Sequence, residues 1–135
     1  MKLVGEDGSL VIERSEIGPP GTPADRDILL NVTVEAAGFA AADQSWIVES
    51  AWNGFLAELR HLEARRKGRA TLESASPDDL RVEFFSTDRA GHMAVKGQVR
   101  RRTPEGFELR LEFAFAFEPD VLPRVLSEVA ALGPR

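Results

Sequence analysis

The stretch Phe107-Glu-Leu-Arg-Leu-Glu-Phe-Ala-Phe-Ala-Phe117 decides the fold of this chain. Apolar residues stand at every second position, and charged residues followed by two alanines stand between them. A period of two places successive side chains on opposite faces of a β-strand. Residues 107–117 are therefore predicted to form a long strand with one aromatic face. Burial of aromatic surface is favourable, so the rest of the chain must cover that face.

The turn before this strand predicts how the strand pairs with its neighbour. Pro104-Glu105-Gly106 suits a three-residue hairpin loop, in which a type I turn is followed by a glycine in the left-handed region. The apolar faces of the two strands match only if odd-numbered residues oppose odd-numbered residues. The predicted pairs are Thr103 with Phe107, Val99 with Leu111, Gly97 with Phe113, Val95 with Phe115 and Met93 with Phe117 on the apolar face, and Arg102 with Glu108 and Gln98 with Glu112 on the other.

Two segments are predicted to form amphipathic helices. Apolar residues recur at three- and four-residue intervals over residues 47–66, and the helix is expected to end near Lys67-Gly68. A shorter apolar stripe predicts a final helix over residues 120–132. The expected N-caps are Asp43 or Ser45 for the first helix and Asp120 for the second.

Period-two alternation predicts further strands, and the order of elements predicts the fold class. These strands are expected at residues 9–14, 28–36, 70–74, 80–84 and 93–99. Residues 37–44 are mostly small and predict a connection. The order is then β-β-α-β-β-β-β-α. We predict an α+β fold in which a single, mostly antiparallel sheet of about six strands carries both helices on one face.

The length predicts one domain over residues 1–135. Within it, residues 15–27 are expected to form a mobile loop. The segment Gly18-Pro-Pro-Gly-Thr-Pro23 suits neither a helix nor an interior strand, because proline lacks a backbone donor.

The composition limits the classes of function. The chain has no cysteine, which excludes disulfides, thiolate metal sites and a cysteine nucleophile. Its formal net charge of −5 disfavours broad contact with nucleic acid or an anionic membrane, since both require neutralisation of phosphate. No apolar run is long enough to cross a membrane, and the acidic residues soon after Met1 do not suit a signal peptide. We therefore expect a cytoplasmic protein.

No set of residues predicts catalysis, metal binding or cofactor binding. The two histidines, His61 and His92, share no ligand spacing and are expected to be solvated. Aspartates in turns commonly accept hydrogen bonds from the backbone, and three carboxylate pairs have this setting: Glu6-Asp7, Asp25 with Asp27, and Asp78-Asp79. An enzyme would need such carboxylates to converge on a histidine. We predict no catalytic residue, no metal ligand and no cofactor.

Two basic clusters are expected to be structural or solvated charge. They are Arg65-Arg66-Lys67 with Arg69, and Arg100-Arg101-Arg102. Neither is interleaved with the aromatic residues that favour binding of nucleic acid. The first cluster stands at a predicted helix C-terminus, where the helix dipole favours cations. Arg101 is an exception, because its parity places it on the apolar face of the strand.

The tryptophans and a group of alanines leave some interpretations open. Trp52 falls inside the apolar stripe of the long helix and is predicted to be buried. Trp46, at the expected first turn of that helix, suits either packing or contact with a partner. A small-residue patch on the charged face of the sheet indicates either a second surface pressing there or simple tolerance; it comprises Ala94, Ala114 and Ala116.

These segments together resemble the bacterial WapI-type immunity protein family over about residues 8–132. The matching segments are Ile28-Leu-Leu-Asn-Val-Thr-Val34 with Gly38-Phe39, Trp46-Ile47, Trp52-Asn-Gly-Phe-Leu-Ala-Glu-Leu59, Gly68-Arg-Ala-Thr-Leu72, Gly91-His-Met-Ala-Val-Lys-Gly97, Leu109-Arg-Leu-Glu-Phe113 and Asp120-Val-Leu122. The resemblance implies a small non-enzymatic cytosolic protein that binds and blocks a cognate toxin. An acidic immunity protein would suit a basic nuclease toxin. Binding surfaces diverge within such families, so the partner-binding residues stay unknown.

Three further hypotheses accompany this one. A curved sheet and a long helix that enclose an apolar pocket would make a small-ligand carrier of the helix-grip type. An enzyme is the next alternative. The strand at residues 107–117 also predicts a homodimer, because an edge strand left uncovered can pair with a second copy of the chain.

Overall fold

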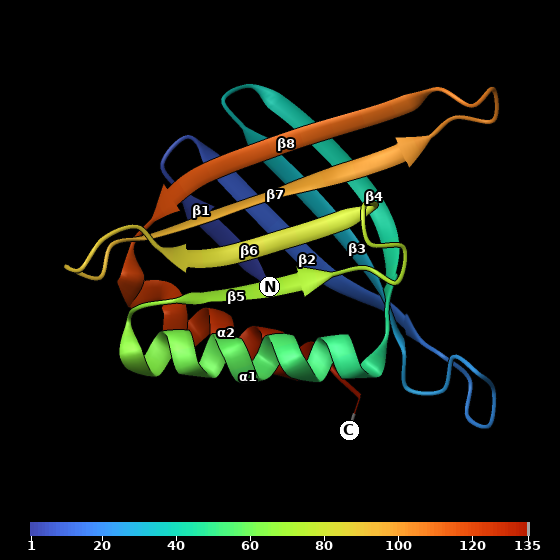
Figure 1. The fold of residues 1–135 in the computed structure, drawn as a ribbon, viewed down its shortest axis with the longest axis horizontal. Coiled ribbons are helices and arrows are strands. Elements are labelled where there is room, and N and C mark those ends of the chain that lie inside the picture. The colour runs from blue at the N-terminus through green and yellow to red at the C-terminus, as the bar shows by residue number, and fades with distance from the viewer. Residues whose placement is uncertain (135) are drawn as a thin grey trace.

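The computed structural model describes residues 1–134 and contains two four-stranded antiparallel sheets. Both sheets follow chain order, β1-β2-β3-β4 and β5-β6-β7-β8 (Figure 1). The elements are β1 Lys2–Gly5, β2 Gly8–Ile17, β3 Ile28–Ala36, β4 Phe39–Ile47, α1 Glu49–Arg65, β5 Arg69–Glu73, β6 Leu80–Ser86, β7 Met93–Arg102, β8 Glu108–Phe117, the 3-10 helix η1 Pro119–Val121 and α2 Leu122–Leu132.

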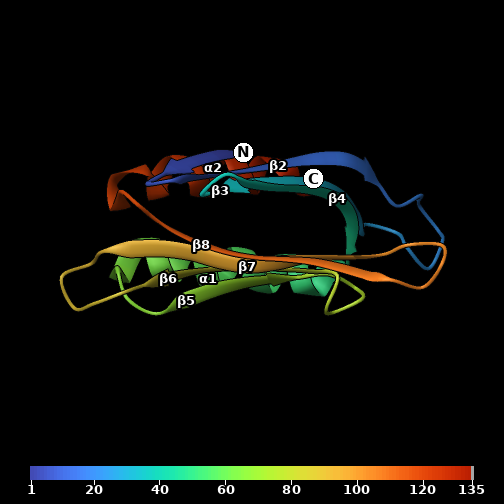
Figure 2. The ribbon, with the colours of Figure 1, turned by 90° about the horizontal axis from the view of Figure 1, so that it is seen from above.

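The two sheets form two layers that face each other (Figure 2), and both helices lie along one side of them (Figure 1). α1 runs beside the edge strand β5, where Thr71 N donates to Glu58 Oε1 at 3.1 Å. α2 runs beside the edge strand β1, where Arg124 Nη1 donates to Lys2 O at 3.0 Å. The predicted α+β class is confirmed. The predicted single sheet of six strands with both helices on its face is wrong, because a second sheet covers the aromatic face.

The predicted single sheet differs from the two observed sheets because local sequence patterns did not reveal two strands, β1 and β4. β1 is only four residues long. β4 contains the alanine run 40–42, and the polar residues Asp43 and Ser45 share their face with the buried Ile47, so its alternation is weak. We expected Asp43 or Ser45 to cap α1. This prediction is wrong, because β4 continues to Ile47 and the N-cap position is Val48. Asp120 is not a cap either, since it lies inside η1 and no side chain caps that helix or α2.

The predicted pairing of β7 with β8 is confirmed at every position. Gly97 lies opposite Phe113, and Val99 lies opposite Leu111. A Cβ atom at Gly97 would come 2.1 Å from Arg81 O and 3.0 Å from the Phe113 ring. Glycine therefore makes room for this ring, as expected from the register.

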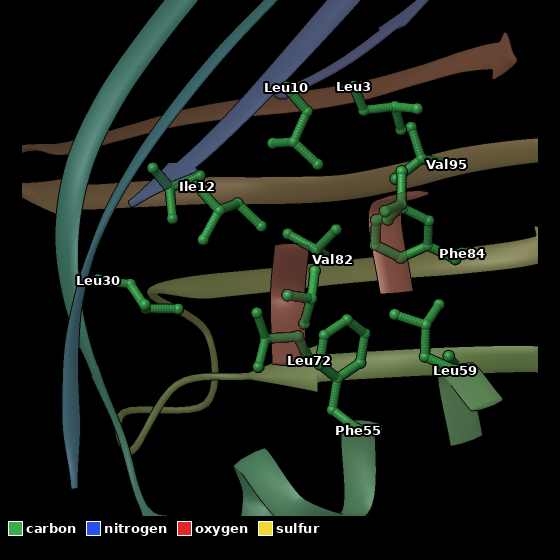
Figure 3. Packing of buried hydrophobic residues seen from close by; sticks show 14 of the residues in the cluster. Leu3, Leu10, Ile12, Leu30, Phe55, Leu59, Leu72, Val82, Phe84 and Val95 are labelled. Carbon is green, nitrogen blue, oxygen red and sulfur yellow. The ribbon is translucent and has the colours of Figure 1, made fainter. Parts of the chain in front are cut away.

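The core lies between the inner faces of the two sheets and the apolar faces of the helices (Figure 3). The predicted burial of Trp52 is confirmed. A chain of aromatic contacts runs from α1 into the second sheet: Trp52 with Phe55 at 5.9 Å, Phe55 with Phe84 at 6.0 Å and Phe84 with Phe117 at 6.0 Å between ring centroids. These rings join α1 to the strand that decides the fold.

The connection between β2 and β3 is shorter than the predicted loop. β2 continues to Ile17, so residues 15–17 belong to a strand. Residues 18–27 form turns, in which Gly18 N donates to Asp27 O at 2.8 Å and Asp25 N donates to Thr22 O at 3.0 Å. The mobility of this segment stays a prediction.

The neighbouring residues Phe84 and Phe85 test the two faces of the second sheet. Phe84 is buried in the core, whereas Phe85 lies on the outer face under the Lys96 ammonium, 4.9 Å from the ring centroid. We expect Phe84→Ala to lower the free energy of unfolding by about 3–5 kcal/mol and Phe85→Ala by about 1 kcal/mol. Urea denaturation measures both, and equal losses would contradict the two-layer arrangement.

Candidate partner-binding surface

The net negative charge of the protein resides in residues 1–48, which form the first sheet. Residues 1–48 hold eight Asp and Glu residues but three Lys and Arg residues, whereas residues 49–117 hold eleven acidic and twelve basic residues. The net charge of −5 therefore belongs to the sheet formed by β1 to β4. Charge asymmetry between the parts of a chain is a signal that the sequence alone contains.

Two carboxylates of this sheet project from its outer face. Leu10 and Ile12 of β2 are buried, so Glu13 points to the opposite side. By the same argument, the buried Val34 directs Glu35 of β3 outward. No helix covers this face (Figure 2).

Apart from Asp43, which Arg101 pairs, the acidic groups on the strands and the β1–β2 turn of the first sheet are unpaired, whereas those of the second sheet are largely paired. Within the described part of the chain, Glu6, Asp7, Glu13 and Glu35 form no ion pair. By contrast, the buried Glu83 of β6 has Lys96 Nζ at 3.3 Å, Arg81 Nη2 at 3.8 Å and Arg69 Nη1 at 3.9 Å. Free negative potential is therefore concentrated on the first sheet, where it can attract a cationic partner.

An aromatic side chain shares this face. Trp46 lies on β4 with 36% of its surface exposed, and Leu29 of β3 is its neighbour in the register. The expected position of Trp46 in the first turn of a helix is therefore wrong. Exposed tryptophan and unpaired charge on one face are typical of a protein–protein interface. We call the set Glu6, Asp7, Glu13, Glu35 and Trp46 the acidic face.

The turn that carries Glu6 and Asp7 is held against β8. Glu6 N donates to Ala116 O at 2.9 Å, and Ala37 N donates to Asp7 O at 2.9 Å. A Cβ atom at Gly5 would lie 2.2 Å from Ala116 O, and one at Gly8 would lie 2.4 Å from the Phe115 ring. Only glycine permits this approach, so the two carboxylates sit on a turn of defined position.

The histidines and the predicted carboxylate pairs do not come together. His92 Nδ1 lies 2.6 Å from Asp88 Oδ2, and both side chains are exposed in the β6–β7 loop. This hydrogen bond raises the pKa of His92 and lowers the pKa of Asp88. His61 is exposed on α1.

The other predicted carboxylates make local contacts. Asp25 Oδ2 accepts from Gly21 N at 3.1 Å, and Asp27 Oδ1 accepts from Glu49 N at 3.0 Å. Asp79 Oδ1 accepts from Arg100 Nη2 at 3.1 Å, and this contact raises the pKa of Arg100. These contacts order loops and do not form an acid–base site.

The basic clusters contribute contacts between elements. Arg66 Nη1 donates to Pro119 O at 2.7 Å, which links α1 to η1. Arg101 reaches from β7 to β4, where Nη2 lies 2.6 Å from Asp43 Oδ1 and 3.2 Å from Ala42 O. The parity of Arg101 predicted which face of β7 it occupies. Its partner Asp43 lies on β4, a strand that the sequence pattern did not predict.

The alanine patch lies on the outer face of the second sheet. Ala94 pairs with Phe85 on one side and with Ala116 on the other. Ala114 lines a groove of about 570 Å³ together with Glu83 and Lys96. The three cations that line this groove, Arg69, Arg81 and Lys96, are all paired with Glu83, so it is a weaker candidate than the acidic face.

Two further kinds of feature are absent from the described part of the chain. Among the described residues, no group of three or more His, Cys, Asp or Glu side chains is arranged to hold a metal ion. None of the described helices combines the length and the apolar character needed to span a membrane.

The comparison with protein families gives one match. The model described as the Immunity protein WapI-like family matches residues 2–132. Because this match spans nearly the whole chain, the chain belongs to that family. No curated protein and no solved structure matches it.

The contact between His92 and Asp88 predicts a measurable titration. We expect the pKa of His92, followed by NMR, to lie above 6.5 and to fall in the variant Asp88→Asn. A raised pKa means that protonated His92 favours the folded state at pH below 6.5 and that this contribution is lost as the pH rises through the folded pKa. An unchanged His92 pKa in Asp88→Asn would contradict the contact.

Proposed function

We propose that this immunity-family chain neutralises a cognate toxin by binding it through the acidic face. The observation that carries the proposal is the set of carboxylates on the first sheet that have no cationic partner among residues 1–134. Family membership supports the toxin as the class of partner. The proposal therefore combines a class of partner with a surface of matching charge.

The partner surface that fits is basic. A nuclease toxin binds a polyanion and needs Lys and Arg side chains at its substrate site. Glu13, Glu35 and the turn carboxylates offer fixed negative groups to such a site, and Trp46 offers an apolar anchor at the end of the face nearer Glu13. Covering that site excludes the substrate, so neutralisation requires no reaction by the immunity protein.

The enzyme and carrier hypotheses gain less support. The contact between His92 and Asp88 is exposed and has no reactive group beside it among the contacts described. The space between the sheets is filled by apolar side chains that meet across it, including Leu10, Phe84 and Val95 (Figure 3). A helix-grip carrier would need an open apolar pocket there.

Binding to a toxin encoded by a neighbouring gene tests the proposal. Co-expression of this chain is expected to restore growth that the toxin arrests, and the purified pair is expected to form a complex. The association rate is expected to fall as salt increases, because opposite charges steer the encounter. Lack of protection and lack of binding with every neighbouring toxin would contradict the proposed function.

A charge-reversal series tests the surface. We expect Glu13→Lys combined with Glu35→Lys to weaken toxin binding by roughly tenfold to a hundredfold, mainly through the association rate. The matched control is Glu105→Lys with Glu73→Lys, which changes the net charge equally on the second sheet. Equal weakening by both variants would mean that net charge matters and that the acidic face is not the binding surface.

A further inference from the structure

We propose that β8 pairs in antiparallel fashion with β8 of a second copy of this chain, so that two second sheets join into one. This inference concerns self-association and does not rest on toxin binding. It starts from the hydrogen-bonding groups at the edges of the sheets. An edge strand presents unpaired N–H and C=O groups, and proteins usually cover them.

Three of the four sheet edges receive hydrogen bonds from helices, from the other sheet or from a loop. At β1, Lys2 O accepts from Arg124 Nη1 of α2. At β5, Thr71 N donates to Glu58 of α1. At β4, Ala42 O accepts from Arg101 Nη2 and Trp46 O accepts from Ala75 N at 2.8 Å. Each of these strands therefore has groups from another element at its outer side.

The fourth edge, β8, is open over most of its length. Thr103 N donates to Phe107 O at 2.8 Å, so the odd-numbered residues of β8 form the hydrogen-bonded pairs with β7. The even-numbered residues then direct their backbone groups outward. Ala116 fits this orientation, since its carbonyl accepts from Glu6 N. No such contact is made in the described chain by the preceding outward residues Glu108, Arg110, Glu112 and Ala114.

Exposed apolar side chains accompany the open edge. Phe107 is 69% exposed and Leu109 is 59% exposed on the face that elsewhere forms the core. Leu109 and Leu111 line a groove of about 340 Å³ whose other wall is the alanine run 40–42 of β4. These small residues leave space beside β8 for the side chains of another strand.

The first sheet extends past this edge. Gly8 lies against the Phe115 ring of β8. In the first sheet Gly8 pairs with Ala36 of β3, and Ala36 pairs with Phe39 of β4. Phe39 therefore lies beyond β8, and it is 67% exposed. Figure 1 shows the β3–β4 hairpin projecting past β8 on this side. A strand added to β8 would lie over that hairpin, and Phe39 would cover its apolar side chains.

Charge selects the occupant and the register. Hydrogen bonding across the open edge must join even-numbered residues of both strands. A two-fold centre at Arg110 would place Arg110 opposite itself, and a centre at Glu112 would place Glu112 opposite itself. Like charges directly opposite destabilise a sheet. A centre at Leu109 would place Glu108 opposite Arg110. It would also require Gly106 to pair with Glu112, although Gly106 has a positive φ and lies in the turn between β7 and β8.

A centre at Leu111 satisfies all these conditions. Arg110 of each copy then lies opposite Glu112 of the other, and Glu108 lies opposite Ala114. On the apolar face Leu111 meets its own counterpart, and the exposed Leu109 meets Phe113. The pairing uses every residue from 108 to 114, which is the open part of the edge. The strand thus complements itself in charge, which favours a second copy over an unrelated strand.

Sedimentation equilibrium of the full chain tests the charge pairs. We expect a reversible dimer whose dissociation constant rises roughly tenfold in Arg110→Glu, because two Glu–Glu contacts replace two Arg–Glu contacts. Glu112→Arg is expected to act likewise. The combined variant Arg110→Glu with Glu112→Arg restores opposite charges and is expected to recover the dimer. Circular dichroism checks that each variant is folded.

Cysteine cross-linking tests the centre of symmetry, and the chain has no cysteine of its own. The two copies of residue 111 form a non-hydrogen-bonded pair, in which Cα atoms approach to about 4.5 Å. Leu111→Cys is therefore expected to form a disulfide between two chains under mild oxidation. Leu109→Cys is the matched control: it is more exposed but lies opposite residue 113, so we expect little cross-linking.

Several outcomes would overturn the proposal. They are a monomer at every concentration, a dimer that neither single charge reversal weakens, and faster cross-linking of Leu109→Cys than of Leu111→Cys. If the wild-type chain is monomeric and Arg110→Glu abolishes toxin binding, the proposal is overturned and the open edge is assigned to the toxin. The proposed toxin-binding surface is tested separately, by the combined variant Glu13→Lys with Glu35→Lys. The two proposals can therefore fail independently.

Discussion

The aromatic inner face of the second sheet has to be covered, and the position of the first sheet follows from that requirement. The helices reach only part of this face, through contacts such as Phe55 with Phe84, because α1 and α2 lie along the edges of β5 and β1. The first sheet covers it instead, and the close approach of Gly5 and Gly8 to β8 brings the layers together. Arg101 joins them at the opposite side through Asp43. Burial of apolar surface thus supplies the attraction, while glycines and one ion pair determine how the sheets meet.

The same arrangement explains where charge can collect. The inner face of the first sheet belongs to the core, so its carboxylates project into solvent, with the exception of Asp43, which Arg101 pairs. In the second sheet the acidic groups are largely neutralised by neighbouring cations, as Glu83 is by Lys96. The unpaired carboxylates of the first sheet repel one another and so oppose folding of the free chain. A cationic partner would relieve this repulsion, which is why we interpret the asymmetry as functional.

Local signals were sufficient for the second sheet and insufficient for the first. The register of β7 with β8 follows from a three-residue turn and the parity of apolar residues, both of which are local. β4 escaped detection because its alanines weaken the alternation, and because the inward Asp43 is stabilised by Arg101 from a distant strand. Without β1 and β4, one sheet seemed to account for all strands. The acidic face was not recognised either: the charge asymmetry is present in the sequence, but the outward side of Trp46 follows only from β4.

The alternating charges of β8 have two consequences for its open edge. Charged residues on an edge strand normally discourage pairing, because a random partner leaves them opposed or desolvated. Glu108, Arg110 and Glu112 alternate in sign, so pairing centred on either Arg110 or Glu112 brings like charges together. Displacement of the centre to Leu111 turns the same residues into complementary pairs. The pattern therefore disfavours indiscriminate strand addition and favours one symmetric arrangement, which accounts for an edge that is open from residue 108 to residue 114.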